Sequence, residues 1–138
     1  MNERAQAVPR ISCVMPTVNQ AATLPRVVPQ VLAALAQLSP HVELIVVNDG
    51  SRDATAAVAT ALCAVHPQLV LIDLSRNFGK EAALSAGLDG ARGDVVFLMD
   101  ADGQHPTTLL SEMLAGWRQG YDVVYTVRRT RSDQSALQ

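Results

Sequence analysis

Apolar and polar positions divide the chain into a regular alternation of strand-like and helix-like segments. Short apolar runs with β-branched residues are typical of buried strands, and the chain holds five of them: Ile11–Pro16, Val42–Val47, Leu69–Leu74, Asp94–Met99 and Asp122–Val127. Longer segments with helical character separate these runs: Leu24–Leu38, an alanine-rich stretch that ends near Val65, Lys80–Ala91 and Thr108–Gln119. The pattern therefore predicts strands and helices that follow one another in turn.

This alternation also predicts the fold class. Strands that are apolar on both faces and alternate with helices indicate an open, mostly parallel α/β sheet with helices on both faces. We expect one domain over residues 11–131, ending after about five strands, with a polar tail at 1–10 and a second tail at 132–138.

Local signals set the expected ends of the helices. Pro29 lies inside the first helical pattern, where it either begins the regular part of the helix or kinks it. Ser51 or Asp53 is suited to cap the second helix, and Gly120 is suited to end the fourth.

Composition and charge exclude several classes of protein. With 49% hydrophobic and 17% charged residues, the 138-residue chain does not have the composition of a disordered protein. Cys13 and Cys63 lie inside apolar segments, which favours buried, reduced thiols over a disulfide framework. The net charge of −2 argues against a nucleic-acid-binding protein. No apolar run reaches the ~18 residues of a membrane span, and no signal peptide is recognisable, so we expect a cytoplasmic protein.

Polar residues gather where the predicted strands end. They follow four of the five strands: Asn19 and Gln20, then Asn48 and Asp49, then Arg76, Asn77 and Lys80, then Asp100 and Asp102. Each of them alone is explained as a loop residue or a helix cap. Ligands of open α/β sheets bind at the carboxyl ends of the strands, so this coincidence predicts a binding site at that edge.

The sharpest of these features is the pair Asp100 and Asp102. Two carboxylates directly after a buried strand suit Mg²⁺ or Mn²⁺, which completes its shell with water and phosphate oxygens. Such an ion stabilises a diphosphate as a leaving group. His105 follows closely, and for it a structural and a functional role are both open.

Two common nucleotide-binding motifs are absent from the sequence. The G-x-G-x-x-G turn of dinucleotide-binding folds does not follow the first strand, and the G-x-x-x-x-G-K-[ST] phosphate loop does not occur. The acidic residues of a receiver-type phospho-acceptor domain are also missing from the ends of the first and third strands.

Four stretches of the sequence resemble a known family in their order and spacing. They are PTVNQAATLP, VVNDGSRDAT, LSRNFGKEAALSAGLDGARGD and FLMDADGQHP. Over about Ile11 to Arg131 they are similar to the family-2 glycosyltransferases with a GT-A fold. The greatest similarity is to the polyprenyl-phosphate sugar transferases, a group with dolichol-phosphate mannose synthase and the bacterial undecaprenyl-phosphate glucosyl- and aminoarabinosyl-transferases.

The resemblance implies an activity and its partners. It implies inverting transfer of a sugar from a UDP- or GDP-sugar to a polyprenyl phosphate at the cytoplasmic face of a membrane, with Mg²⁺ or Mn²⁺ as cofactor. The general base is expected beyond the end of this chain. A non-catalytic domain that binds a nucleotide sugar or a protein partner without turnover is the alternative.

The resemblance also implies roles for ten residues. Pro16, Val18 and Gln20 match positions that line the base and ribose, and Val47 and Asp49 match positions that contact the nucleoside. The metal and diphosphate motif corresponds to Asp100, Ala101 and Asp102, with Asp100 and Asp102 as metal ligands. Gln104 falls beside the donor sugar, and Arg129 falls near the diphosphate.

The chain departs from the family pattern at four positions. The family usually has Tyr at Val18, Glu at Gln20, Asp at Asn48 and Leu at Gly103. Two carboxylates are thus replaced by amides, which removes negative charge near the expected nucleotide. The family's domain is also longer, so we expect an open sheet edge through which two copies could associate.

Overall fold

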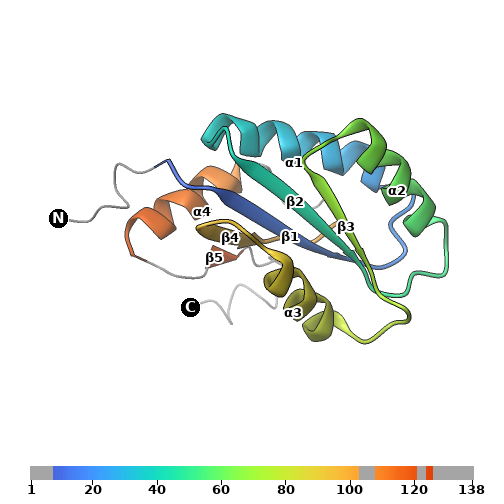
Figure 1. Cartoon of the computed structure of the whole chain (residues 1–138). Helices are drawn as coiled ribbons and strands as arrows, with labels where there is room; N and C mark the ends of the chain where they lie inside the picture. Colours follow the sequence, from blue (N-terminus) through green and yellow to red (C-terminus); the bar gives the residue numbers. More distant parts are fainter. Residues whose placement is uncertain (1–7, 103–107, 121–123, 126–138) are drawn as a thin grey trace, which may run out of the picture.

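The strands of the computed structural model form one parallel sheet. The structure describes residues 8–102, 108–120 and 124–125, and within them the sheet has five strands in the order β3-β2-β1-β4-β5. Their bounds are β1 Ile11–Thr17, β2 Val42–Asn48, β3 Leu69–Asp73, β4 Val95–Leu98 and β5 Val124–Tyr125. Every neighbouring pair is parallel, so the predicted parallel α/β sheet is confirmed (Figure 1).

The helices are divided between the two faces of the sheet. Their bounds are α1 Leu24–Leu38, α2 Thr55–Val65, α3 Lys80–Gly90 and α4 Leu109–Arg118. The helix α1 contacts both α2 and α4, whereas α3 packs on β1 and β2 from the other side (Figure 1). The chain moves outward from β1 to β3 and then returns to β4, and crossovers of one hand put α3 opposite α1 and α2.

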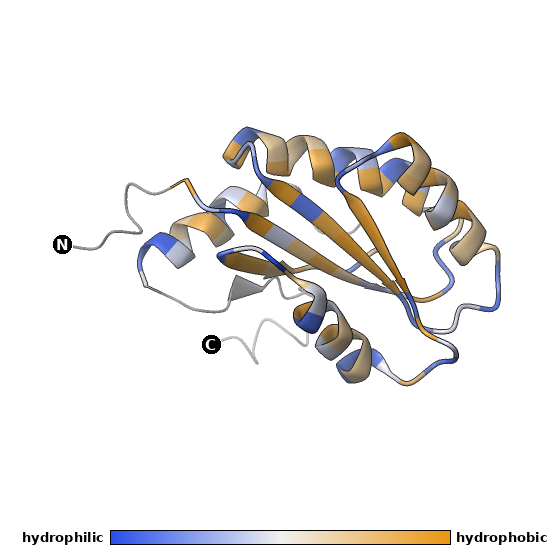
Figure 2. Ribbon diagram, viewed as in Figure 1, coloured by the Kyte–Doolittle hydropathy of each residue, from blue (hydrophilic) through white to orange (hydrophobic). Residues whose placement is uncertain are grey.

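Side chains from both faces of the strands are buried, as the apolar runs predicted. The larger core lies under α1, α2 and α4 and includes Cys13, Leu44 and Phe97, all completely buried. The smaller core lies under α3 and is formed by Val14, Ile45, Val47 and Ala83. Figure 2 shows β2, β3 and β4 mostly in orange and many blue positions in the loops.

Most of the predicted element boundaries differ from the structure by one or two residues. The helix α1 runs through Pro29 from Leu24, so Pro29 does not begin its regular part. The residue before α2 is Ala54, so neither Ser51 nor Asp53 is the N-cap residue, although the Asp53 carboxylate accepts the amide of Thr55, the first residue of α2, at 2.9 Å. Gly120 follows α4 with a φ of 109° and ends it as expected.

The remaining fold predictions have mixed outcomes. Cys13 and Cys63 are both free thiols, but Cys63 is only half-buried. Pro9 and Arg10, assigned to the N-terminal tail, are tied to the domain: the carbonyl of Pro9 accepts the Ser39 hydroxyl at 2.6 Å, and the amide of Arg10 donates to Asp94 at 3.0 Å. The predicted tail at 132–138 lies outside the described residues. No helix in the described ranges is long and apolar enough to cross a membrane.

Candidate functional site

A pocket of about 350 Å³ lies at the carboxyl edge of the sheet, where β1 and β4 end side by side. The strand order changes direction between β1 and β4, which is the place where open α/β sheets bind ligands. Ten residues line the pocket: Pro16, Val18, Gln20, Asp49, Asn77, Gly79, Lys80, Asp100, Ala101 and Asp102.

The structure brings together seven of the ten residues predicted from the sequence, namely Pro16, Val18, Gln20, Asp49, Asp100, Ala101 and Asp102. Val47 does not line the pocket, because its side chain is completely buried in the core under α3. Gln104 and Arg129 lie outside the described residues, as does His105.

Three lining residues were not among the predicted site residues. Asn77, Gly79 and Lys80 come from the segment between β3 and α3, and Lys80 is the first residue of α3. Asn77 and Lys80 were noted as polar residues after a strand, but no motif assigned them a function. The signal that could have identified them is the glycine: Gly79 has a φ of 104°, a backbone conformation that favours glycine directly before a helix.

The carboxylate of Asp49 holds the segment before α3 in place. It accepts hydrogen bonds from the backbone amides of Phe78, at 2.8 Å, and Gly79, at 3.1 Å. Asp49 is 2% exposed, so these bonds are shielded from water. The residue for which the resemblance implied a nucleoside contact therefore also positions one wall of the pocket.

The loop after β2 packs directly on the segment after β3. Gly50 has a φ of 65°, and a Cβ atom on it would come within 2.1 Å of the backbone nitrogen of Asn77. The amide of Leu74 donates to the carbonyl of Asn48 at 3.0 Å. A side chain at position 50 is excluded by both the backbone angle and this close approach.

The loop after β1 is joined to the loop after β2 through Asn19. Its amide donates to the Ser51 hydroxyl at 2.9 Å, and its side-chain oxygen accepts the amide of Arg52 at 2.8 Å. The amide of Gln20 donates to the hydroxyl of Thr55 at 2.9 Å, which fixes the backbone of a pocket residue on the first turn of α2.

Asp53 strengthens the same junction. Its carboxylate accepts the Thr55 hydroxyl and the amides of Thr55, at 2.9 Å, and Ala21, at 3.1 Å. The hydrogen bond from the Thr55 hydroxyl, followed by those from the backbone amides, lowers the pKa of Asp53. The segment 48–55 is thus a scaffold that connects all three loops on this side of the pocket.

Asn48 explains one departure from the family pattern. It is 3% exposed, and its side-chain amide donates to a carboxylate oxygen of Asp73 at 2.8 Å. Its side-chain oxygen accepts the amide of Ser51 at 3.3 Å. An aspartate here would set a second carboxylate against that of Asp73, so the amide suits this chain's own neighbours.

The acidic side of the pocket fits a divalent cation that binds through two carboxylates. Asp100 and Asp102 bring carboxylates from the end of β4, and the described residues hold no group of three or more His, Cys, Asp or Glu side chains arranged to bind a metal. Two carboxylates are the donor set of an ion that takes its other ligands from water and phosphate. A cation is already present: the Lys80 ammonium lies 3.0 Å from Asp100.

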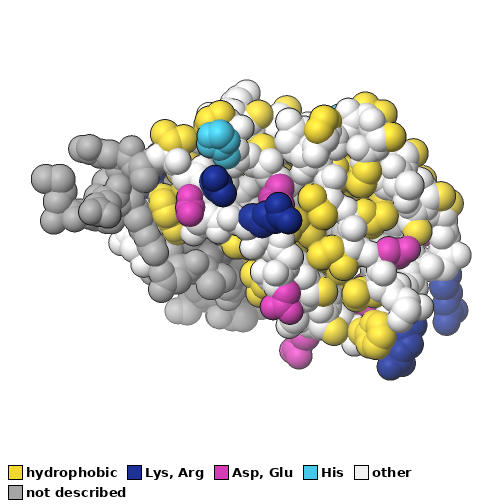
Figure 3. All heavy atoms as spheres, in the orientation of Figure 1, with side chains coloured by type: hydrophobic (Ala, Val, Ile, Leu, Met, Phe, Trp, Pro, Cys, Tyr) yellow, Lys and Arg dark blue, Asp and Glu magenta, His cyan; other side chains and the backbone are white. Residues whose placement is uncertain are grey.

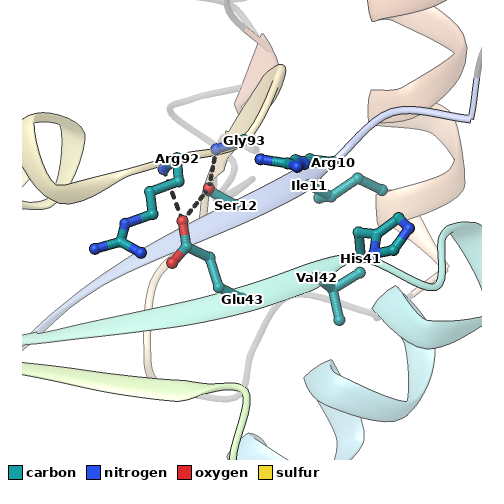
Figure 4. A pocket seen from close by; sticks show the side chains of 8 residues that line it. All are labelled: Arg10, Ile11, Ser12, His41, Val42, Glu43, Arg92 and Gly93. Atoms are coloured by element: carbon teal, nitrogen blue, oxygen red, sulfur yellow. Dashed lines mark hydrogen bonds between the residues drawn. The ribbon is translucent and has the colours of Figure 1, made fainter.

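A second, smaller pocket of about 170 Å³ lies at the opposite edge of the sheet, where β1 and β2 begin (Figure 4). Its central polar groups bind one another. Glu43 accepts the Ser12 hydroxyl at 2.6 Å and the amide of Arg92 at 2.7 Å, and the Ser12 hydroxyl accepts the amide of Gly93 at 2.8 Å. These bonds join β1, β2 and the turn before β4, so this cluster serves the fold.

Comparisons with known proteins point to one family. A family model, glycosyl transferase family 2, matches residues 12–137. An uncharacterised glycosyltransferase of Synechocystis sp. is 42% identical over 91% of this chain and 39% of its own length. An undecaprenyl-phosphate 4-deoxy-4-formamido-L-arabinose transferase of Aeromonas hydrophila is 41% identical over 89% of this chain and 38% of its own length.

A solved structure shares the fold. A mannosyltransferase of Pyrobaculum calidifontis, in complex with GDP-Man and Mn²⁺, is 27% identical with a TM-score of 0.64, over 71% of this chain and 29% of its own. The chain thus spans about two fifths of the length of the curated relatives that it matches. The family match over most of the sequence and the GT-A-like fold together show that this chain belongs to glycosyltransferase family 2.

Proposed function

We propose that this chain is the donor-binding part of a glycosyltransferase that moves a sugar from a nucleotide diphosphate to a polyprenyl phosphate at the cytoplasmic face of a membrane. The observation that carries the proposal is the pocket at the ends of β1, β2 and β4, which contains two acidic residues of one strand end and a lysine opposite them. The Aeromonas hydrophila relative is named for an undecaprenyl-phosphate acceptor, which supports the acceptor class.

In this proposal the two sides of the pocket take different parts of the donor. Pro16, Val18, Gln20 and Asp49 would surround the nucleoside, with Val47 supporting Asp49 from the core. Asp100 and Asp102 would hold Mg²⁺ or Mn²⁺ beside Ala101, and this ion would neutralise the diphosphate as it leaves the sugar. Gln104 and Arg129 are proposed to lie near the sugar and the diphosphate. The Pyrobaculum calidifontis structure is in complex with GDP-Man and Mn²⁺, which supports a nucleotide sugar and a divalent metal as the two ligands.

Calorimetric titration tests the donor site. UDP- and GDP-sugars are titrated into the purified chain with and without Mn²⁺. We expect one nucleotide to bind only with the metal, and Asp102→Asn to weaken that binding by about tenfold or more, since even indirect supports of a metal site contribute that much. Asp89→Asn, on an exposed part of α3, is the matched control. Equal binding by the Asp102→Asn and Asp89→Asn variants would contradict the metal assignment.

A binding domain without turnover is the second candidate. It is favoured by Gln20, an amide in the pocket where the family usually has a glutamate. Gln20→Glu is expected to tighten donor binding if the missing carboxylate matters, and unchanged affinity would mean that the pocket accommodates the amide. Transfer of sugar to a polyprenyl phosphate by the chain would exclude this candidate.

A further inference from the structure

The ion pair between Lys80 and Asp100 occupies the acidic side of the pocket. The Nζ atom of Lys80 lies 3.0 Å from a carboxylate oxygen of Asp100, and both residues line the pocket. Lys80 is the only lysine in the sequence. The Asp100 side chain is 30% exposed, so this carboxylate is partly open to the solvent.

The backbone that carries Lys80 is fixed. The two residues before it donate their amides to the buried carboxylate of Asp49, and the carbonyl of Gly79 accepts the amide of Ala83 at 3.0 Å within α3. The side chain itself is 65% exposed and has a flexible four-carbon stem. The ammonium can therefore change partners while its attachment point stays where it is.

We propose that Lys80 is the counter-ion of Asp100 in the metal-free protein, and that a divalent cation must displace it to bind. This inference rests on the proposed donor site. A metal ion and an ammonium cannot share one carboxylate oxygen at contact distance without strong repulsion. A diphosphate on the metal supplies oxygens within reach of Lys80 and gives the displaced ammonium a new partner.

The consequence is that metal and nucleotide bind cooperatively. A metal ion that binds alone breaks the ion pair between Lys80 and Asp100 and leaves the Lys80 ammonium without a new anionic partner. When a diphosphate binds with the metal, Lys80 exchanges its pair with Asp100 for a pair with the diphosphate. Each ligand therefore raises the affinity for the other by the same factor. Lys80 therefore makes the site bind the metal and the nucleotide as a unit.

Manganese titrations followed by electron paramagnetic resonance test this directly, since the signal of free Mn²⁺ falls as the ion binds. Without nucleotide, Lys80→Gln is expected to bind Mn²⁺ about two- to fivefold more tightly than the unaltered chain, because it has no exposed ion pair to break. Adding UDP or GDP should raise the Mn²⁺ affinity of Lys80→Gln by a smaller factor than it raises that of the unaltered chain. Lys80→Arg keeps the charge and should retain the weak binding of Mn²⁺ alone.

The control is Arg52→Gln, which removes one positive charge from an exposed residue at the same edge of the sheet that does not line the pocket. Circular dichroism and urea unfolding check that each variant is folded. If Mn²⁺ binds, but Lys80→Gln binds it no more tightly than Arg52→Gln does, the proposed role of Lys80 is overturned and the proposed donor site is not. Absence of Mn²⁺ binding in every variant, with and without nucleotide, would overturn the proposed donor site together with it.

Discussion

Single side chains at the carboxyl edge of the sheet connect elements that are far apart in the sequence. Asn48, at the end of β2, binds Asp73 at the end of β3 and Ser51 in the following loop. A carboxylate in its place could accept from Ser51 but could not donate to Asp73. The replacement of the family's usual aspartate by Asn48 is thus understood from local hydrogen bonding, independently of any ligand.

Asn48→Asp is therefore expected to destabilise the chain at neutral pH. It removes the hydrogen bond of 2.8 Å from the Asn48 amide to Asp73 and puts a carboxylate beside the Asp73 carboxylate, which we estimate to cost about 1–2 kcal/mol of unfolding free energy. Urea unfolding at pH 7 measures the loss. The double variant Asn48→Asp with Asp73→Asn restores one donor and one acceptor, so it should recover most of the stability. A single variant as stable as the original chain would show that the Asn48–Asp73 bond contributes nothing.

At the scale of elements, the loops after β1, β2 and β3 form one connected structure. Asp49 is part of it, because its buried carboxylate satisfies two backbone amides before α3. Asp49→Ala leaves both amides without this partner and is expected to lower the free energy of unfolding by about 2 kcal/mol. The amides of Phe78 and Gly79 should then exchange hydrogen faster. Asp89→Ala on the outside of α3 should change neither the free energy of unfolding nor the exchange of these amides. Unaltered exchange at both amides would contradict the role of Asp49.

The helices and strands could be predicted from sequence because their signals are local. Apolar runs and helical spacing gave every element within a few residues, and the family motifs gave most of the residues that line the pocket. The hydrogen bonds and close contacts between the loops could not be predicted. The bond from Asp49 to Phe78 and Gly79 spans about 30 residues of sequence, and the contact of Gly50 with Asn77 depends on how β2 and β3 lie together. That Lys80 lines the pocket was missed for the same reason.

At the scale of the whole molecule, the sheet has a protected centre and a less protected edge at β3. The central strands β1 and β2 carry the completely buried residues Cys13, Val14 and Val46, whereas Val70 on the edge strand β3 is 39% exposed. Burial was predicted for both cysteines because each lies in an apolar run. It is complete only for Cys13, since α2, which carries Cys63, is an outer layer packed on the sheet from one side. Association through the open edge stays a prediction.

Cys13 makes the stability of the whole sheet measurable. Burial raises the pKa of its thiol from 9.0 to about 12. Because only the thiolate reacts with iodoacetamide, the raised pKa lowers the reactive fraction of the thiol at pH 8, and the closed sheet blocks access as well. In a Cys63→Ala variant, which has this thiol alone, we expect alkylation only in molecules that have unfolded globally. The rate should then rise with urea in parallel with unfolding, whereas Cys63 in a Cys13→Ala variant should react without urea because it is half-buried. Fast alkylation of Cys13 in the folded chain would show that β1 separates from its neighbours without global unfolding.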